Sequence, residues 1–548
     1  CWGRSAGPSL NCKLVMNELN GMRALLATNL RRDKVLLPVC VATFAGVASA
    51  SAAATADLYP DVTSRALAAE LFNATPALLA LYGRVYDPTS LGAIGLIKLT
   101  AFGVVMVGLF AALVVIRHTR ADEELGRYEL LAGGSIGRFA SLAAALLSSV
   151  IGVIGIGVVT APALMIAGLP VNGSMALALS WIVGGLAFGG VGAVAAQLTA
   201  SARTARGLAV IALAVAYLLR AAGDSIGTPE PAWPSWLSPI GWAQQIRPYA
   251  GDRWALALLP ISFGVVMVAL ATVLARHRDV GAGLLPQRRG AAEAPPLLAG
   301  TFGLAWRLQR AGFLVWLAGF ILLSLIVGQI VTRIGDMLST PVARQLITAL
   351  GGVGELTKAF VAVELSFVAV FAAAYGISST LRLQSEESTM RADLILSTPT
   401  GRLRWARSHM IMALIGTAIL MLASGLGVGI AHAAEGGDRS VLSADLLAAI
   451  VRLPAVWVLV GVTVALYGLA RRAAPFAWAV LVATFLVSEI GPLLDLPSWI
   501  RDLSPFTHVP ALPGGEVKAG LLLGLLVAAA VLSAAGLWAL RRRDLGIA

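Results

Sequence analysis

The chain has 548 residues, of which 58% are hydrophobic and only 13% are charged, and its formal net charge is +12. A water-soluble domain carries about 25% charged residues. A surface this poor in charge excludes an ordinary soluble fold and predicts that lipid is the solvent of this protein.

Twelve apolar runs approach or exceed the length of about 20 residues that a helix needs to cross a bilayer. They lie at 35–56, 95–116, 139–167, 174–200, 207–222, 254–275, 311–332, 361–381, 408–433, 446–470, 475–493 and 519–540. The fifth run, 207–222, is the shortest. We therefore expect an all-α polytopic membrane protein with about 12 transmembrane helices, preceded by a disordered lead-in at residues 1–20.

The basic residues alternate in density from loop to loop. They gather in the clusters 31–34, 117–120, 203–206, 276–278, 471–472 and 541–543. Cytoplasmic loops collect Lys and Arg, so this pattern predicts that both termini are cytoplasmic. The strong preference for arginine over lysine suggests a GC-rich bacterial genome, and we expect the bacterial cytoplasmic (inner) membrane. The positive charge thus has its origin in topology, and we expect no nucleic-acid partner.

The chain contains an internal duplication, which is the signature of a repeated fold. Residues 122–138 align without a gap to residues 386–402, and five of the 17 positions are identical. The Pro-Ser-Trp segment at 234–239 is echoed at 497–505. Arg278-Asp-Val-Gly is echoed by Arg543-Asp-Leu-Gly, each directly after a sixth helix. Three echoes in the same order predict two homologous halves.

The first six-helix half is expected at 21–285 and the second at 301–548. Both halves would begin and end in the cytoplasm, so the repeats are expected to be parallel, related by an axis along the membrane normal. Residues 286–300 are rich in Pro, Ala and Arg without apolar periodicity. They are predicted to be a flexible cytoplasmic linker.

The duplicated segment after each second helix combines acidic and basic residues. Helical spacing predicts an ion pair between Glu123 and Arg127, and another between Glu387 and Arg391, in the favourable order at i,i+4. One interpretation is a docking element for a cytoplasmic partner, since one copy per half would suit a symmetric partner. The alternative is a solvated helix end that is capped by its own ion pair.

Few charges fall inside the predicted spans. Lys98 and Glu364 take nearly equivalent positions early in the second and eighth helices, while Arg220 and Glu489 lie late in the fifth and eleventh. Intramembrane ionisable groups are candidates for function. We consider an outer gate in which Lys98 faces Glu364, or Arg220 faces Glu489. The alternative is that these side chains snorkel to the membrane interface.

Several catalytic motifs are missing from the sequence. It has no G-x-x-x-x-G-K-[ST] phosphate loop, no H-E-x-x-H or G-x-S-x-G segment and no paired-cysteine metal site. We therefore expect a transport subunit without its own nucleotide-binding domain, metal or cofactor, and not an enzyme in itself.

The duplicated segments carry a family resemblance. Glu-Glu-x-x-x-Arg, followed by an apolar pair, a small-residue turn and Gly-Arg, resembles the loop after the second helix in permeases of the ABC-2 (type V) exporter class. From about residue 21 to 548, the chain resembles the two-fold-repeat exporters of polyketide antibiotics (tetronasin-type) of high-GC Gram-positive bacteria. The matching pieces are Leu30-Arg-Arg-Asp-Lys, Ala305-Trp-Arg-Leu-Gln-Arg, Ser238-Pro-Ile-Gly-Trp, Ser504-Pro-Phe-Thr-His and the terminal Arg-Arg-Arg-Asp-Leu-Gly.

This resemblance implies a separate ABC ATPase subunit, in two copies, that binds ATP and Mg and drives alternating access. Hydrophobic drugs or polyketide-like antibiotics would be the cargo. The duplicated segments would be the coupling helices. The residues that would couple them to the ATPase are Asp122, Glu123, Arg127, Glu129, Glu386, Glu387, Arg391 and Asp393. The second copy differs from the first by Met390 in place of Gly126 and by Pro399, so the two docking sites are expected to be unequal.

Three other functions compete with the exporter. A proton-coupled secondary drug antiporter has the same helix count, but it places a carboxylate near mid-membrane, whereas Glu364 and Glu489 lie near the predicted outer ends. A membrane-embedded enzyme needs a catalytic motif, which is not seen. A non-transporting scaffold has no reason to keep two docking segments.

Overall fold

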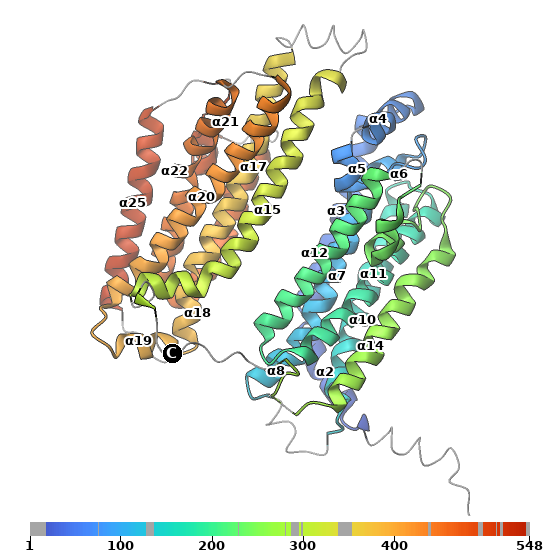
Figure 1. Cartoon of the computed structure of the whole chain (residues 1–548), viewed down its shortest axis with the longest axis horizontal. Coiled ribbons are helices and arrows are strands. Elements are labelled where there is room, and N and C mark those ends of the chain that lie inside the picture. Colours follow the sequence, from blue (N-terminus) through green and yellow to red (C-terminus); the bar gives the residue numbers. More distant parts are fainter. Residues whose placement is uncertain are drawn as a thin grey trace, which may run out of the picture. The chain divides into compact units, whose positions relative to one another are not determined.

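The computed structural model describes residues 18–74, 76–127, 136–227, 230–279, 281–285, 295–296, 300–337, 353–436, 440–490, 497–510, 512–513, 515 and 519–543. All of the regular structure in these residues is helical (Figure 1). Among these described residues, twelve helical stretches are long and apolar enough to cross a membrane. The predicted helix class and the number of spans are therefore confirmed.

The chain divides by its contacts into two compact units, Cys1–Arg289 and Gly290–Ala548. The long helices of unit 1 are α3 (Leu36–Leu58), α7 (Ile97–Arg117), α10 (Ala140–Ile166), α11 (Val171–Leu198), α12 (Ala202–Ile226) and α14 (Leu258–Arg276). Its short helices are α2 (Met22–Arg32), α4 (Val62–Ala74), α5 (Pro76–Tyr82), α6 (Leu91–Gly95), α8 (Arg120–Glu124), η1 (Trp233–Leu237), α13 (Pro239–Gln244) and η2 (Trp254–Ala257).

Unit 2 has the long helices α15 (Thr301–Met337), α17 (Val353–Thr380), α20 (Arg402–Gly436), α21 (Ser440–Val451), α22 (Leu453–Leu469), α23 (Ala477–Ile490) and α25 (Ala519–Arg542). Its short helices are α18 (Arg382–Ser388), α19 (Arg391–Leu396), η4 (Arg471–Phe476), α24 (Ser498–Arg501) and η5 (Pro505–His508).

Three helices differ from their predicted extent. The fifth span, expected to be short, is the 25-residue α12, because polar residues at both ends continue the helix beyond its apolar part. The seventh begins at Thr301, ten residues before the apolar run. The tenth is two helices, α21 and α22, with Arg452 between them.

Each unit has its own core, in which small residues bring helices close together. In unit 1, Trp181 of α11 lies against Gly103 of α7 and donates its indole proton to the carbonyl of Leu99 at 3.1 Å. In unit 2, a side chain at Gly468 of α22 would overlap the carbonyl of Gly536 in α25. Small residues allow such close backbone contact between membrane helices.

Arg452 is fully buried at the junction of α21 and α22. Its guanidinium donates to the carbonyls of Ala448 and Ala362, both at 2.6 Å, and to the carbonyl of Leu512 at 3.2 Å. The free carbonyl groups at a helix end need donors. Arg452 supplies them at the end of α21 and ties that end to α17 and to the segment before α25.

The segment between the last two long helices is anchored in the same way in both units. In unit 1, Ser238 accepts hydrogen bonds from the first turn of α13 and donates to the carbonyl of Ala216 in α12 at 2.6 Å. In unit 2, Ser504 accepts from the amide of Phe506 and donates to the carbonyl of Thr484 in α23 at 2.8 Å. Each Ser-Pro motif therefore fastens a short helix to the preceding long helix.

Candidate functional site

The predicted coupling segment of unit 1 lies at the end of α7. Helix α7 ends at Arg117, and His118 and Thr119 separate it from the short α8, which carries Asp122 and Glu123 in its first turn. Figure 1 shows α8 beyond the end of α7 and close to α2. We call this end of unit 1, where α7 ends and α10 begins, its charged end.

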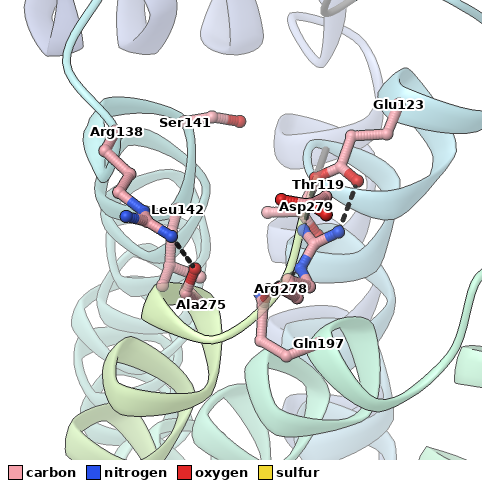
Figure 2. A pocket seen from close by; sticks show the side chains of 9 residues that line it. All are labelled: Thr119, Glu123, Arg138, Ser141, Leu142, Gln197, Ala275, Arg278 and Asp279. Atoms are coloured by element: carbon pink, nitrogen blue, oxygen red, sulfur yellow. Dashed lines mark hydrogen bonds and ion pairs between the residues drawn. The ribbon is translucent and has the colours of Figure 1, made fainter. Parts of the chain in front are cut away.

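Glu123 joins α8 to the end of α14. Arg278, just after α14, donates both of its terminal nitrogens to the Glu123 carboxylate, at 2.6 and 2.8 Å (Figure 2). Arg120 donates to the same carboxylate at 2.9 Å and to the carbonyl of Ala196 in α11. The carboxylate and both arginines are almost entirely shielded from solvent. A two-pronged arginine–carboxylate contact of this kind is strong and directional.

The ion pair that we predicted between Glu123 and Arg127 is wrong. Helix α8 ends at Glu124, and Gly126 has φ +69°, so the chain turns away before Arg127 can stand one turn above Glu123. Arg127 instead pairs with Asp122 at 3.3 Å.

Asp122 also accepts from Arg32 of α2 at 2.7 and 3.1 Å. The hydrogen bond to Asp122 raises the pKa of Arg32 against the opposing effect of burial, so the guanidinium stays charged. Asp122 and Glu123 of α8 therefore bind different neighbours: Asp122 binds α2, and Glu123 binds the end of α14.

A cavity of about 70 Å³ lies beside the Glu123–Arg278 pair, and Glu123, Arg138 and Arg278 are among its lining residues (Figure 2). Arg138 donates to the carbonyls of Ala275 and Arg276 at the end of α14. Arg138, before α10, and Glu123 of α8 therefore both bind the end of α14.

Unit 2 repeats this arrangement. Arg543, just after α25, pairs with Glu387 of α18 at 2.7 Å, and the Tyr467 hydroxyl donates to the same carboxylate at 2.7 Å. Arg402, the first residue of α20, donates to the carbonyl of Arg543 at 3.0 Å. Within its own unit, each acidic segment is thus bound to the end of the last long helix.

The second predicted i,i+4 pair, between Glu387 and Arg391, is also wrong. Arg391 lies 3.5 Å from Glu386, which also pairs with Arg382 at 2.9 Å. The reason is the same as in unit 1, because α18 ends at Ser388 and Met390 has φ +55°. Met390 takes the position of Gly126 in the duplication and adopts the same left-handed backbone, which disfavours a side chain.

The predicted coupling residues that remain are Glu129 and Asp393. Glu129 lies outside the described residues. Asp393 is exposed in the first turn of α19. Large apolar side chains stand in solvent beside the acidic segments, with Leu125 62%, Met390 59% and Leu394 74% exposed.

Comparison with known proteins identifies the family. The family model for the multidrug efflux system permease Rv1217c, C-terminal domain, matches residues 298–541. The multidrug efflux system permease protein Rv1217c of Mycobacterium tuberculosis (strain ATCC 25618 / H37Rv) is 43% identical over 528 residues, which are 96% of this chain and 95% of that protein. The chain belongs to the family of multidrug efflux system permeases. This permease is a multi-pass membrane protein with 12 candidate spans.

The permease has a second buried charge group that the sequence reading missed. Asp33, after α2, lies 2.5 Å from the ring of His118 and 3.2 Å from Arg117. Asp33 and His118 are both buried. The sequence marks Asp33 only as one acid inside a basic cluster, and nothing in the local pattern pairs it with a residue 85 positions away.

The four charges considered for an outer gate have different surroundings. Lys98 is exposed, with its ammonium 5.9 Å from the ring of Tyr82, and Glu364 is half-buried in α17. Arg220 is fully buried, where it lies 3.5 Å from Asp224 and donates to the carbonyl of Leu81. The guanidinium of Arg220 is therefore held inside unit 1. The side chain of Glu489 lies outside what the structure describes.

Asp224 lies near the end of α12, and polar groups of the segment that follows α12 surround its carboxylate. Ser235 donates to its carboxylate at 3.0 Å. Nearby, Arg247 pairs with Glu230 and stacks 3.6 Å from the ring of Tyr86. Burial raises the pKa of Glu230, but the hydrogen bond and charge of Arg247 outweigh it and hold that pKa below its usual value. In the described ranges, no group of three or more His, Cys, Asp or Glu side chains could hold a metal ion.

Proposed function

We propose that this permease is the transmembrane subunit of an ATP-driven ABC-2 type exporter that removes hydrophobic drugs from the cell. The observation that carries the proposal is the doubled contact Glu123–Arg278 and Glu387–Arg543. Each glutamate follows the second long helix of its unit, and each arginine follows the last. Two equivalent acidic segments are what a symmetric pair of motor subunits would need.

The two units are proposed to be parallel six-helix repeats with both termini in the cytoplasm. The duplication at offset 264, the doubled glutamate–arginine contact and the doubled Ser-Pro anchor support this arrangement. On the same proposal, the charged ends face the cytoplasm, where Arg and Lys collect.

The contacts suggest a division of labour within each coupling segment. Glu123 and Glu387 are shielded and bound to arginine, so they would fasten the segment to its bundle. The exposed apolar side chains Leu125, Met390 and Leu394 would instead enter the partner's surface. Exposed large apolar side chains beside charges are typical of a protein interface.

In this mechanism, two copies of a separate ATPase bind ATP and Mg and close on each other. Their movement displaces α8 and α18. Because Glu123 and Glu387 connect these helices to the ends of α14 and α25, the displacement reaches the last helix of each bundle directly. The cargo site would thereby change from inward-open to outward-open, with no titrating carboxylate needed in mid-membrane.

The proposal is tested by uptake of the dye Nile red into inverted membrane vesicles that contain the permease with or without a co-expressed ABC ATPase subunit. We expect uptake that requires both the ATPase and ATP. Leu125→Asp with Leu394→Asp should abolish uptake while membrane levels stay normal. Leu503→Asp, outside the candidate spans and 70% exposed, is the control for the same loss of an exposed apolar group. Uptake without the ATPase that collapses with the proton gradient would establish an antiporter instead.

An outer gate is a separate part of the proposal. Lys98 with Glu364 remains the first pairing, because both side chains have exposed surface within their own units. Arg220 with Glu489 is the second, and it requires Arg220 to leave Asp224. Lys98→Ala and Glu364→Ala are each expected to reduce ATP-driven uptake by up to about fivefold, because an exposed charge contact contributes about 0.2–1 kcal/mol. Unchanged uptake in both variants would contradict the first pairing.

A further inference from the structure

The last span of unit 2, α25, packs against its bundle with one face only. Ala529 and Gly536 lie against Gly461 and Gly468 of α22, so the two helix backbones touch (Figure 1). The structure describes α25 along its whole length, and its buried residues are these two and Leu540. The opposite face of α25 is therefore uncovered within unit 2.

That opposite face ends in an aromatic and basic group. With 3.6 residues per turn, Trp538 stands half a turn away from Gly536 and Leu540, and Arg541 and Arg542 follow it by one turn. Trp538 is 57% exposed, and both arginines are exposed. The guanidinium of Arg542 lies 3.9 Å from the centre of the Trp538 ring. Because helical side chains point back toward the N-terminus, this contact holds the Arg542 charge level with the end of the span.

The basic residues of this group have no acidic partner. Arg402, the exposed first residue of α20, donates to the carbonyl of Arg543, so it joins them at the end of α25. In the described part of the chain, Arg543 pairs with a glutamate, but no ion pair involves Arg402, Arg541 or Arg542. Asp544 lies outside the described residues, and with it the Arg-Arg-Arg-Asp motif still has a net charge of +2, from three arginines and one aspartate. Such unpaired basic charge at the end of a span attracts anionic lipid headgroups.

An apolar stripe leads along α25 to Trp538. Val527 and Val531 are exposed and lie on the same side of the helix as Trp538, because steps of four and seven residues return to nearly the same direction. The order along this face is apolar, aromatic and then basic, which is the order from acyl chain to headgroup in a phospholipid. The stripe lies within the candidate span, where a water-soluble partner has no access. The three unpaired charges in turn do not suit a neutral apolar drug.

Unit 1 shows which of these features helix packing requires. In α14, Val273 takes the place of Trp538 and His277 takes the place of Arg542, each 265 residues earlier in the chain. The end of α14 is nevertheless held to its bundle by the same glutamate and arginine contacts as the end of α25. The contact between Trp538 and Arg542 is therefore not needed to fasten the last helix, which leaves it available to a ligand.

We propose that the end of α25 is a binding site for one anionic phospholipid. The phosphate lies among the guanidinium groups of Arg402, Arg541 and Arg542, the indole of Trp538 lies beside it at headgroup level, and one acyl chain lies along the apolar stripe. Arginine suits phosphate because its planar guanidinium can donate two parallel hydrogen bonds to it. The inference uses only the membrane assignment of α25, so it does not depend on the ABC ATPase or on the cargo.

Two variants remove the site without changing the core, because the side chains that they replace are exposed. Trp538→Val with Arg542→His copies unit 1 at both positions. Arg542→Gln removes one charge and keeps a long polar side chain. Arg206→His, at an exposed arginine of α12 in unit 1, is the matched control for the loss of an arginine elsewhere.

Affinity is measured by native mass spectrometry of the purified permease in detergent, at about pH 8, where histidine is neutral. The permease is titrated with phosphatidylglycerol or with phosphatidylcholine of the same acyl chains. We expect one saturable phosphatidylglycerol, bound at least about tenfold more tightly than phosphatidylcholine. Arg542→Gln should weaken it about fivefold, the effect of one basic residue near an anionic headgroup, and the double variant about tenfold or more. Arg206→His should bind within about twofold of wild type.

The place of binding is tested in phosphatidylcholine nanodiscs with phosphatidylglycerol that carries a diazirine on one acyl chain. Illumination attaches this lipid to neighbouring residues, which can then be mapped. We expect the label on α25, displaced by unlabelled phosphatidylglycerol. Glycerol phosphate, which has a similar phosphate group but no acyl chain, should not displace it.

Several results would overturn the proposal. They are equal affinity for the two lipids, a label that maps away from α25, and wild-type affinity in the double variant. Displacement by glycerol phosphate would assign the arginines to a soluble phosphate compound. Unchanged lipid binding in the double variant with weakened capture of a co-expressed ABC ATPase would assign them to that partner. None of these readouts uses ATP-driven uptake, so failure here leaves the exporter proposal standing, and failure of ATP-driven uptake leaves this site standing.

Discussion

Reversal of the charge at Arg278 is expected to stop transport and destabilise unit 1. In Arg278→Glu, the new carboxylate faces Glu123 in a site where both native side chains are about nine-tenths shielded. Removing one partner of a buried ion pair costs about 3–5 kcal/mol. We therefore expect ATP-driven uptake to fall at least about tenfold and the thermal unfolding temperature to drop.

The double reversal Glu123→Arg with Arg278→Glu is the decisive control. It restores an opposite pair across α8 and the end of α14, although Arg120 still repels the guanidinium introduced on α8, so partial recovery of stability and uptake is expected. Arg206→Glu, an exposed charge reversal on α12, should have little effect. Equal loss in the single and double variants would mean that Glu123 and Arg278 do not act through their mutual contact.

Removal of the guanidinium of Arg452 is expected to unfold unit 2. Arg452→Leu leaves the buried carbonyls of Ala448 and Leu512 without the guanidinium that donates to them, whereas the carbonyl of Ala362 keeps the hydroxyl of Ser366. Each buried carbonyl that loses its partner costs about 1–3 kcal/mol, which together reaches the lower end of the stability of a typical domain. The measurement is the yield of monodisperse permease after detergent extraction, which should fall close to zero.

Arg452→Lys tests whether geometry or charge matters at that junction. An ammonium group keeps the charge but cannot hold three carbonyls in the fixed fork of a guanidinium, so an intermediate yield is expected. Arg501→Leu, on the short helix α24, is the control for arginine loss elsewhere in the same unit. A normal yield of Arg452→Leu would contradict the proposal that Arg452 stabilises the junction of α21 and α22.

The spans were predictable because apolar length is a local property of the chain. All 12 predicted runs correspond to long helices, and the errors are at the ends, as with α12 and α15, where polar residues extend a helix beyond its apolar part. The break at Arg452 was missed because the apolar run continues through it, and only the packing around α21 shows a buried arginine holding a helix end.

The candidate site was predictable in its residues but not in its contacts. The duplication singled out both the Glu123 segment and the Arg278 motif, yet helical spacing assigned Glu123 to Arg127, four positions away. Local spacing fails there because Gly126 ends the helix, and the true partner lies 155 positions along the chain. In unit 2, Glu387 and Arg543 are paired in the same way.

By itself, therefore, the sequence determined a membrane protein of 12 spans with two matching acidic segments, because hydropathy and repetition are written residue by residue. The tertiary structure alone decided which arginines hold those segments and which carbonyls the buried guanidinium of Arg452 binds. The physical reason is that ion-pair partners and cavities depend on which helices pack together, and helix packing brings together residues that no local pattern connects.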